Sequence, residues 1–265
     1  MIVDGKAIAE EIYGQLNARR GALSRAARLG IVVCGHDPVI ESFVRIKMRS
    51  AKRLGVEMVR KDISSDANTE DTIDAIRQLA PEVDTLIVQL PLGKGIDTNA
   101  ALSAIPDDED VDAISTATGE HLVQAPVALA VVEILRRSGV DPSGKQVIVV
   151  GNGRLVGAPS AALLKKLGAQ VSMFTLEQGS IADLKDADII VSGAGQPGLI
   201  KPEHIKDGVA LIDAGASEHS GKVVGDADPA CAAKCAVFTP VPGGVGPLAV
   251  AMIFKNLFDL IEGKR

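Results

Sequence analysis

A glycine-rich turn between an apolar run and a helix constrains the fold of this chain more than any other stretch. In Gln146-Val-Ile-Val-Val-Gly-Asn-Gly-Arg-Leu-Val-Gly-Ala-Pro159, a β-branched run ends at Val150 and glycines follow at positions 151, 153 and 157. Pro159 is expected to open a helix over 160–167, which Gly168 ends. Such a turn lets the backbone approach a pyrophosphate, which the N–H groups of a helix N-terminus can hold. The GxGxxxG spacing differs by one residue from the dinucleotide fingerprint, so a turn without a ligand is the alternative.

The composition indicates buried parallel strands covered by helices. Apolar residues make up 46% of the chain but aromatic residues only 2%, so the core must consist of Val, Ile, Leu and Ala. The length of 265 residues allows one large domain or two modest ones. A net charge of −6 argues against nucleic acid as the main partner. With no apolar run near the ~20 residues of a membrane span, and three cysteines that form no disulfide framework or metal site, a cytosolic protein is expected.

Two βα series follow one another along the chain and predict an α/β fold, in which the second series forms a doubly wound parallel sheet. The first has expected strands at 29–34, 56–63 and 85–90 with helices at 4–16, 42–54, 69–79 and 98–103. The second has short strands at 147–150, 171–174, 189–192, 209–212 and 236–238. A last helix, at 248–262, is apolar nearly all round and is expected to pack back on the first domain.

One lysine departs from the polarity of its predicted helix, 42–54. The apolar stripe consists of Phe43, Val44, Met48, Ala51 and Leu54, and four basic residues (Arg45, Arg49, Lys52 and Arg53) gather on the opposite side. Lys47 instead projects from the apolar stripe. Either its ammonium reaches water along a long stem, or desolvation lowers its pKa and makes it a proton carrier near neutral pH. We favour the second interpretation.

Other polar residues stand where strands end. Gln89 follows a β-branched run, at the strand end where open α/β sheets bind ligands, although polar residues often mark strand ends without a function. The acidic stretch 107–112 is expected to be a solvated loop, except for Asp112, where the chain turns apolar again. Glu177, 26 positions after Gly151, is late for a ribose-binding acid and could equally be an exposed loop residue.

These motifs resemble the methylenetetrahydrofolate dehydrogenase/methenyltetrahydrofolate cyclohydrolase family, over nearly the whole chain. The most specific match is Thr239-Pro-Val-Pro-Gly-Gly-Val-Gly-Pro247; Val88-Gln-Leu-Pro-Leu92, Asp110-Val-Asp112, Val156-Gly157 and Gly225-Asp226 follow the family's order. The resemblance implies a folate-binding catalytic domain over 1–119 and 248–265 and a Rossmann-like NAD(P)-binding domain over 120–247. It also implies tetrahydrofolate one-carbon derivatives as substrates, a homodimer and a final helix that returns to the first domain.

The resemblance gives the unusual residues their roles. Lys47 matches the catalytic lysine, Gln89 the glutamine that positions it, and Asp112 the aspartate that binds the pterin ring. Phe43 and Pro247 are implied as further substrate contacts. The implied cofactor-binding residues are Gly151, Asn152, Gly153, Val156, Gly157, Thr175, Glu177 and Ala216.

Several positions depart from the family pattern. Phe43 replaces a tyrosine, Ala113 replaces the glycine of Asp-Val-Asp-Gly, and Ala125-Pro-Val-Ala128 stands for Pro-Cys-Thr-Pro. Asn152-Gly153 replaces Arg-Ser and Thr175-Leu176 replaces His-Ser, which removes two groups that would bind the 2′-phosphate of NADP and favours NAD. The favoured hypothesis is a bifunctional dehydrogenase and cyclohydrolase. A monofunctional enzyme, a non-catalytic binding paralogue and an unrelated Rossmann dehydrogenase are the alternatives.

Overall fold

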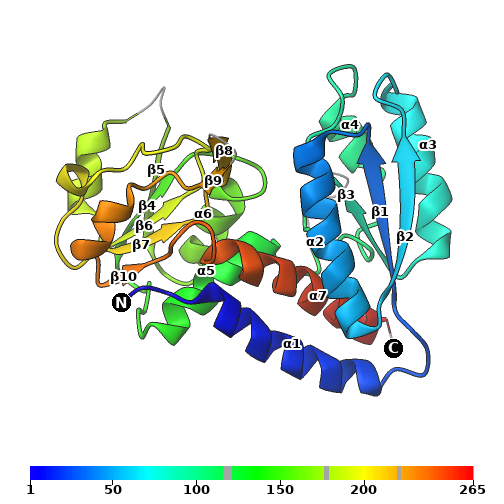
Figure 1. Cartoon of the computed structure of the whole chain (residues 1–265), viewed down its shortest axis with the longest axis horizontal. Coiled ribbons are helices and arrows are strands. Elements are labelled where there is room, and N and C mark those ends of the chain that lie inside the picture. The colour runs from blue at the N-terminus through cyan, green and yellow to red at the C-terminus, as the bar shows by residue number, and fades with distance from the viewer. Residues whose placement is uncertain (116–120, 176–178, 220–221, 265) are drawn as a thin grey trace. The chain divides into compact units, whose positions relative to one another are not determined.

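The structure is a computed structural model that describes residues 1–115, 121–175, 179–219 and 222–264 (Figure 1). The chain forms two compact units. We call Glu11–Pro126 with Ile253–Arg265 the β1–β3 unit, and Met1–Glu10 with Val127–Met252 the β4–β10 unit. Each has a parallel sheet of its own, as the two βα series predict.

The β1–β3 unit is built on a three-stranded sheet in the order β2-β1-β3. Its strands are β1 (Arg28–Cys34), β2 (Glu57–Ile63) and β3 (Thr85–Val88), and all pairs are parallel. Figure 1 shows helices α2 (Pro38–Leu54) and α3 (Thr69–Leu79) flanking these strands; a 3-10 turn (Ala80–Glu82) and α4 (Thr98–Leu102) complete the series. Past β3, Asp110 bridges to Leu86, so the segment that carries Asp112 lies along the sheet.

Local chemistry fixes both ends of α2. The Asp37 carboxylate accepts hydrogen bonds from the amides of Val39 and Ile40, and Pro38 provides the first helical residue. At the other end Gly55 has φ 62°, a conformation that favours glycine, and its amide caps the last turn. The sequence predicted a later start at 42, because the capping turn reads as a loop.

The β4–β10 unit has a five-stranded parallel sheet in the order β10-β7-β6-β4-β5. The strands are β4 (Gln146–Val150), β5 (Gln170–Phe174), β6 (Ile189–Ser192), β7 (Ala210–Asp213) and β10 (Val237–Phe238). Helix α6 (Gly157–Lys166) follows β4. The strand order reverses at β4, so the crevice where such sheets bind ligands lies at the carboxyl ends of β4 and β6.

Several elements of this unit were not predicted from the sequence. Helix α5 (Pro126–Arg137) precedes β4, and an antiparallel hairpin of β8 (Ser217–His219) and β9 (Lys222–Val224) follows β7. Three 3-10 segments (Ile181–Asp186, Pro202–His204 and Pro229–Ala233) supply residues such as Leu184 and Cys231 to the core on one sheet face. They take the place of full crossover helices, and their short lengths leave no helical periodicity to detect.

The first and last helices each contribute to both units. The unit boundary falls inside α1 (Gly5–Gly21) and again inside α7 (Val245–Gly263). The expectation that the last helix returns to the first domain is confirmed, since Ile253–Arg265 belongs to the β1–β3 unit. None of the helices in the described ranges is long and apolar enough to cross a membrane.

Candidate active site

Lys47 lies on α2 as its sequence pattern predicts, at the margin of the buried face. Val44, Ala51 and Leu54 are buried, Lys47 is half-buried, and the four other basic residues of the pattern are exposed. Two members of the predicted stripe are not buried, because Phe43 is 42% exposed and Met48 is 45% exposed. Phe43 stands one helical turn before Lys47, so an apolar ring remains accessible beside the lysine.

Gln89 binds Lys47 directly. The Lys47 Nζ donates to Gln89 Oε1 at 2.6 Å, while Gln89 Nε2 donates to the carbonyl of Leu90 at 2.8 Å. This second bond turns the amide so that its oxygen faces the lysine. The Gln89 side chain is buried, and its backbone amide extends the sheet by donating to Val32. Since the acceptor is neutral, it orients the lysine without adding a second negative charge to the site.

The loop that carries Asp112 is built around the carboxylate of Asp110. This carboxylate accepts hydrogen bonds from the amides of Asp112 (3.2 Å), Ile114 (2.7 Å) and Ser115 (2.6 Å). Asp110 is only 2% exposed, so the prediction of a solvated loop at this position was wrong. Sequence reasoning missed it because a buried carboxylate that binds backbone amides looks like a surface acid in a run of acids.

Ala113 has φ 52°, within the left-handed region that alanine adopts at a cost. It is the position where the family pattern has glycine. The loop therefore keeps its backbone path around Asp112 although the residue suited to that path is missing.

Asn256, on α7, holds the same loop from the other side. Its Nδ2 donates to the carbonyls of Val111 and Gln124, each at 2.8 Å, and the side chain is buried. One of these carbonyls immediately precedes Asp112 in the chain. Asp110 and Asn256 therefore fix the position of the Asp112 segment by hydrogen bonds to its amides and to one of its carbonyls.

Lys47 and Asp112 influence one another electrostatically. Desolvation lowers the pKa of the Lys47 ammonium below its usual value, against the opposing effect of the Asp112 carboxylate. Desolvation also raises the pKa of Asp112 to about 6; the charge of Lys47 lowers it and that of Asp110 raises it further. An amine and a carboxyl with pKa values moved toward neutrality can exchange protons at physiological pH, which is the property a general acid or base requires.

Two glycines of the turn after β4 leave no room for a side chain. A Cβ on Gly157 would lie 1.9 Å from the Gly151 carbonyl oxygen, and one on Gly151 would lie 2.8 Å from the Gly193 carbonyl oxygen. Gly151 also has φ 91°. The loops after β4 and β6 therefore touch at the crevice where the strand order reverses. This bare backbone beside the start of α6 fits a pyrophosphate.

The structure brings most of the predicted cofactor residues to this end of the sheet. Asn152 and Gly153 are exposed, Val156 is half-buried, Gly157 opens α6, Thr175 follows β5, and Ala216 is exposed just before β8. Helix α6 begins at Gly157, two residues before the proline that was expected to open it. Pro247 lies in the first turn of α7, and Glu177 falls outside the described residues.

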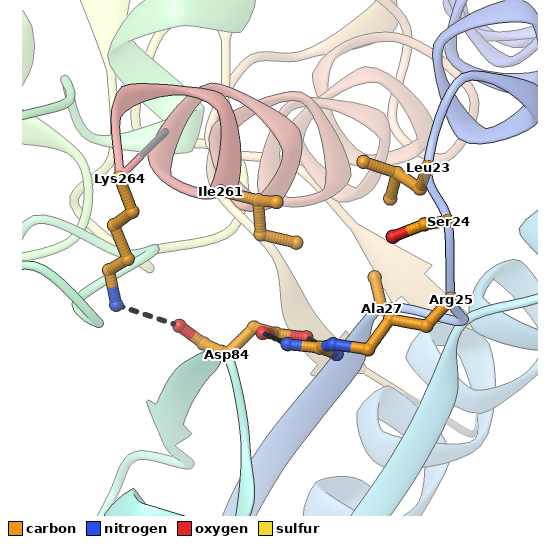
Figure 2. Close-up of a pocket in the computed structure, with 7 residues that line it drawn as sticks. All are labelled: Leu23, Ser24, Arg25, Ala27, Asp84, Ile261 and Lys264. Carbon is orange, nitrogen blue, oxygen red and sulfur yellow. Dashed lines mark hydrogen bonds and ion pairs between the residues drawn. The ribbon is translucent and has the colours of Figure 1, made fainter.

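A cavity of about 260 Å³ in the β1–β3 unit contains none of the predicted site residues. It is lined by Leu23, Ser24, Arg25, Ala27, Asp84, Ile261 and Lys264. Figure 2 shows its charged side chains meeting one another: Arg25 binds the Asp84 carboxylate, and Lys264 donates to the Asp84 carbonyl. Because these polar groups bind one another, we interpret them as structural contacts that hold the cavity wall together.

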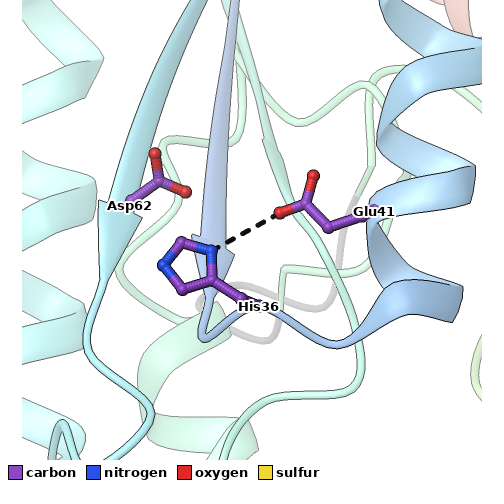
Figure 3. A group of neighbouring side chains, drawn as sticks. All are labelled: His36, Glu41 and Asp62. Atoms are coloured by element: carbon purple, nitrogen blue, oxygen red, sulfur yellow. Dashed lines mark ion pairs between the residues drawn. The ribbon is translucent and has the colours of Figure 1, made fainter.

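His36, Glu41 and Asp62 also lie together, and their potential ligand atoms are within 4.8 Å of one another (Figure 3). Arg60 already neutralises both carboxylates. Its guanidinium donates to Glu41 Oε2 at 2.9 Å and to Asp62 Oδ1 at 2.8 Å. We therefore interpret this group as a surface ion-pair cluster.

The cysteines fit the expectation of packing residues. Cys34, Cys231 and Cys235 are all free and buried. Burial raises the pKa of Cys231 to about 12 and that of Cys235 to about 11, so their thiols stay protonated and unreactive at neutral pH.

Comparisons with known proteins match this geometry over the whole chain. The family model of the tetrahydrofolate dehydrogenase/cyclohydrolase catalytic domain matches residues 3–112, and that of its NAD(P)-binding domain matches residues 125–265. The bifunctional protein FolD of Halothermothrix orenii is 35% identical over 96% of this chain and 95% of its own length.

Solved structures are similar along their full length. The methylenetetrahydrofolate dehydrogenase-cyclohydrolase of Trypanosoma brucei, complexed with NADP and an inhibitor, is 32% identical with a TM-score of 0.92, and the match covers 100% of this chain and 98% of that one. The bifunctional FolD enzyme of Campylobacter jejuni is 26% identical with a TM-score of 0.93, covering 100% and 99%. This chain therefore belongs to the tetrahydrofolate dehydrogenase/cyclohydrolase family.

Proposed function

We propose that this protein oxidises 5,10-methylenetetrahydrofolate to the 5,10-methenyl form and hydrolyses that product to 10-formyltetrahydrofolate. The observation that carries the proposal is the contact of Lys47 with Gln89 in the same unit as Asp112. These are the polar groups that both reactions need in a member of this family. We assign folate binding to 1–119 with 248–265 and NAD(P) binding to 120–247, and we expect a homodimer.

Lys47 is proposed as the proton carrier of the hydrolytic step. As a neutral amine it takes one proton when water adds to the methenyl carbon, and as an ammonium it returns that proton to N5 as the bond between the carbon and N5 breaks. The remaining hydroxyl proton is released to solvent as the formyl carbonyl forms. Desolvation lowers the pKa of the Lys47 ammonium, which makes the neutral amine easier to reach than in an exposed lysine. Gln89 keeps the amine oriented in either protonation state, since its oxygen accepts a hydrogen bond from both.

The substrate ring is proposed to lie over the accessible Phe43 and to bind Asp112. The Asp112 carboxylate accepts hydrogen bonds from the amino and ring N–H groups of a pterin. Phe43 offers a stacking surface, but it cannot donate a hydrogen bond as a tyrosine could. Pro247 is a further proposed contact. A second candidate function, a dehydrogenase without cyclohydrolase activity, is favoured specifically by this missing hydroxyl.

The glycine turn and the start of α6 are proposed to hold the pyrophosphate of a nicotinamide dinucleotide. When bound, the cofactor supplies the acceptor for the hydride that leaves the methylene carbon. The residues Gly151, Asn152, Gly153, Val156, Gly157, Thr175, Glu177 and Ala216 are the proposed contacts. We propose NAD as the preferred cofactor, because exposed Asn152 and Gly153 offer no cation to a 2′-phosphate.

A spectroscopic assay with methylenetetrahydrofolate tests the proposal, with NAD and NADP supplied in parallel. Reduced cofactor should appear, and the methenyl product should not accumulate because the enzyme hydrolyses it faster than it decays without catalysis. The reaction should be faster with NAD than with NADP. Accumulation of methenyltetrahydrofolate would indicate the monofunctional dehydrogenase. No turnover with either cofactor would contradict both catalytic functions and favour a binding paralogue.

A further inference from the structure

Two buried carboxylates lie behind the loops at the carboxyl ends of β6 and β7. Asp226 is 0% exposed and Asp213 is 1% exposed. The two carboxylates interlock with glycines: a Cβ on Gly215 would lie 2.4 Å from the Asp226 Cγ, and one on Gly225 would lie 2.1 Å from an Asp213 oxygen. The Asp226 carboxylate therefore fills the space next to Gly215, two residues after Asp213, and the Asp213 carboxylate fills the space next to Gly225, directly before Asp226.

Asp226 fixes the loop after β6. Its Oδ2 accepts hydrogen bonds from the Ser192 hydroxyl (2.7 Å) and the Ala194 amide (2.8 Å), and its Oδ1 accepts from the Gln196 amide (2.7 Å). All three partners are donors, which is the environment of an ionised carboxylate. The loop from Gly193 to Gln196 contacts the glycine turn after β4, since a Cβ on Gly151 would lie 3.0 Å from the Ala194 Cα.

Asp213 fixes the two neighbouring segments. Its Oδ1 accepts from the Gly215 amide at 2.9 Å and its Oδ2 from the Ala227 amide at 2.8 Å. Burial, reinforced by the charge of Asp226, raises the pKa of Asp213 to about 6. Among the ion pairs identified in the described part of the chain, none involves either acid. The two negative charges are thus held by N–H and O–H dipoles and face no neighbouring side-chain cation that the structure identifies.

The position of these acids relates them to one half of a dinucleotide site. In a doubly wound sheet each half binds one mononucleotide, and the glycine turn takes the pyrophosphate. The acids lie in the half of the sheet formed by β6, β7 and β10. By this rule that half binds the nicotinamide nucleotide of the cofactor. The nicotinamide ring carries a positive charge when oxidised and none when reduced, so buried negative charge favours the oxidised form.

We propose that Asp226 and Asp213 are positioning residues that fix the cofactor loops and bias the site toward oxidised nicotinamide dinucleotide. This inference rests on the proposed nicotinamide site. Such a bias suits an enzyme that must bind the oxidised cofactor before hydride transfer and release the reduced one afterwards. It also explains why two acids occupy a place where neutral side chains could make part of the same hydrogen bonds.

The test is the ratio of the Kd values for reduced and oxidised cofactor, measured by calorimetry on the full-length protein at about pH 8, where Asp213 is ionised. Asp226→Asn and Asp213→Asn should each lower this ratio by about three- to tenfold, because one charge is removed while the shape is kept. Ser192→Ala should weaken both forms alike and leave the ratio unchanged, because it removes a donor and no charge. Asp207→Asn is the matched control, since its carboxylate is 87% exposed and precedes the amino end of β7.

A measurement without mutation provides a second test, which does not depend on the variants folding. Lowering the pH below about 6 protonates Asp213 and should lower the ratio in the wild-type protein. Among the described residues, the titratable groups that interact electrostatically with Asp213 are Asp226 and Cys231, and the thiol stays neutral. Ratios that equal the wild-type value in both folded Asn variants would overturn the proposal while leaving the dinucleotide site intact. If the wild-type protein binds no dinucleotide at all, the proposed function and this inference both fail.

Discussion

Replacing Ala113 by glycine should stabilise the β1–β3 unit, although it removes a methyl group. Ala113 has φ 52°, where its Cβ crowds the following carbonyl oxygen at a cost of roughly 1–2 kcal/mol. Glycine avoids that cost but has more freedom in the unfolded chain, which opposes the gain by about 0.5–1 kcal/mol. We therefore expect the free energy of unfolding to rise by about 0.5–1 kcal/mol.

The sequence offers a selective probe for this measurement. Tyr13 is the single tyrosine of a chain without tryptophan, and it is buried in the β1–β3 unit, where its hydroxyl binds Ser50 at 2.9 Å. Urea unfolding followed by tyrosine fluorescence therefore reports on the unit that contains Ala113. The midpoint of Ala113→Gly should lie above that of the wild-type protein, with an unchanged slope.

The matched control is the same chemical change at an ordinary helical position of that unit. Ala18 is exposed in α1, so Ala18→Gly should lower the free energy of unfolding by about 1 kcal/mol. If Ala113→Gly lowers the midpoint as Ala18→Gly does, the strain assigned to the Asp112 loop does not exist.

The remaining predictions concern catalysis and cofactor choice. Lys47→Met should reduce cyclohydrolase activity by about 10²–10⁴-fold while sparing much of the hydride transfer, and unchanged hydrolysis would remove Lys47 from the mechanism. Asn152→Arg should improve kcat/KM with NADP relative to NAD; a ratio that does not move would refute the assignment of the 2′-phosphate pocket. Because the pKa of Asp112 is raised to about 6, kcat/KM for the folate should fall as the pH drops through about 6 and the carboxyl protonates. Asp112→Asn should lack that limb, and an identical profile would contradict the role. Asn256→Leu should destabilise the β1–β3 unit by about 1–3 kcal/mol, because the Val111 carbonyl loses its hydrogen-bond donor. The KM for folate should rise while cofactor binding stays unchanged. A KM equal to the wild-type value would show that the loop does not need this contact.

The sequence predicted the parts of the fold that carry strong periodicity or punctuation. The helix Thr69–Leu79 and the strand Ile189–Ser192 have the predicted bounds. Lys47 could be recognised as a candidate site residue because the four other basic residues of its helix lie on the polar face, whereas Lys47 lies on the apolar stripe. Gln89 could be placed because it follows a buried strand, and in the structure its side chain accepts a hydrogen bond from Lys47.

What the sequence could not predict depends on partners distant along the chain. Asp226 meets the Ser192 segment across 34 positions, and Asn256 meets Val111 across 145. No local sequence pattern indicates such contacts, because the residue type alone does not show whether an acid is buried or exposed. The left-handed conformation of Ala113 was equally hidden, since alanine by itself predicts the opposite.

The division of α1 and α7 between the two units has a consequence for synthesis on the ribosome. The chain passes from one unit to the other after Glu10, Pro126 and Met252, so neither unit is a continuous segment. The β4–β10 unit pairs Ile2 with Phe238, and the β1–β3 unit needs Asn256 to hold the Asp112 loop. Many multidomain proteins fold one domain while the next is still being translated. This chain cannot complete either unit in that way. Both cores must wait until almost all of it has emerged.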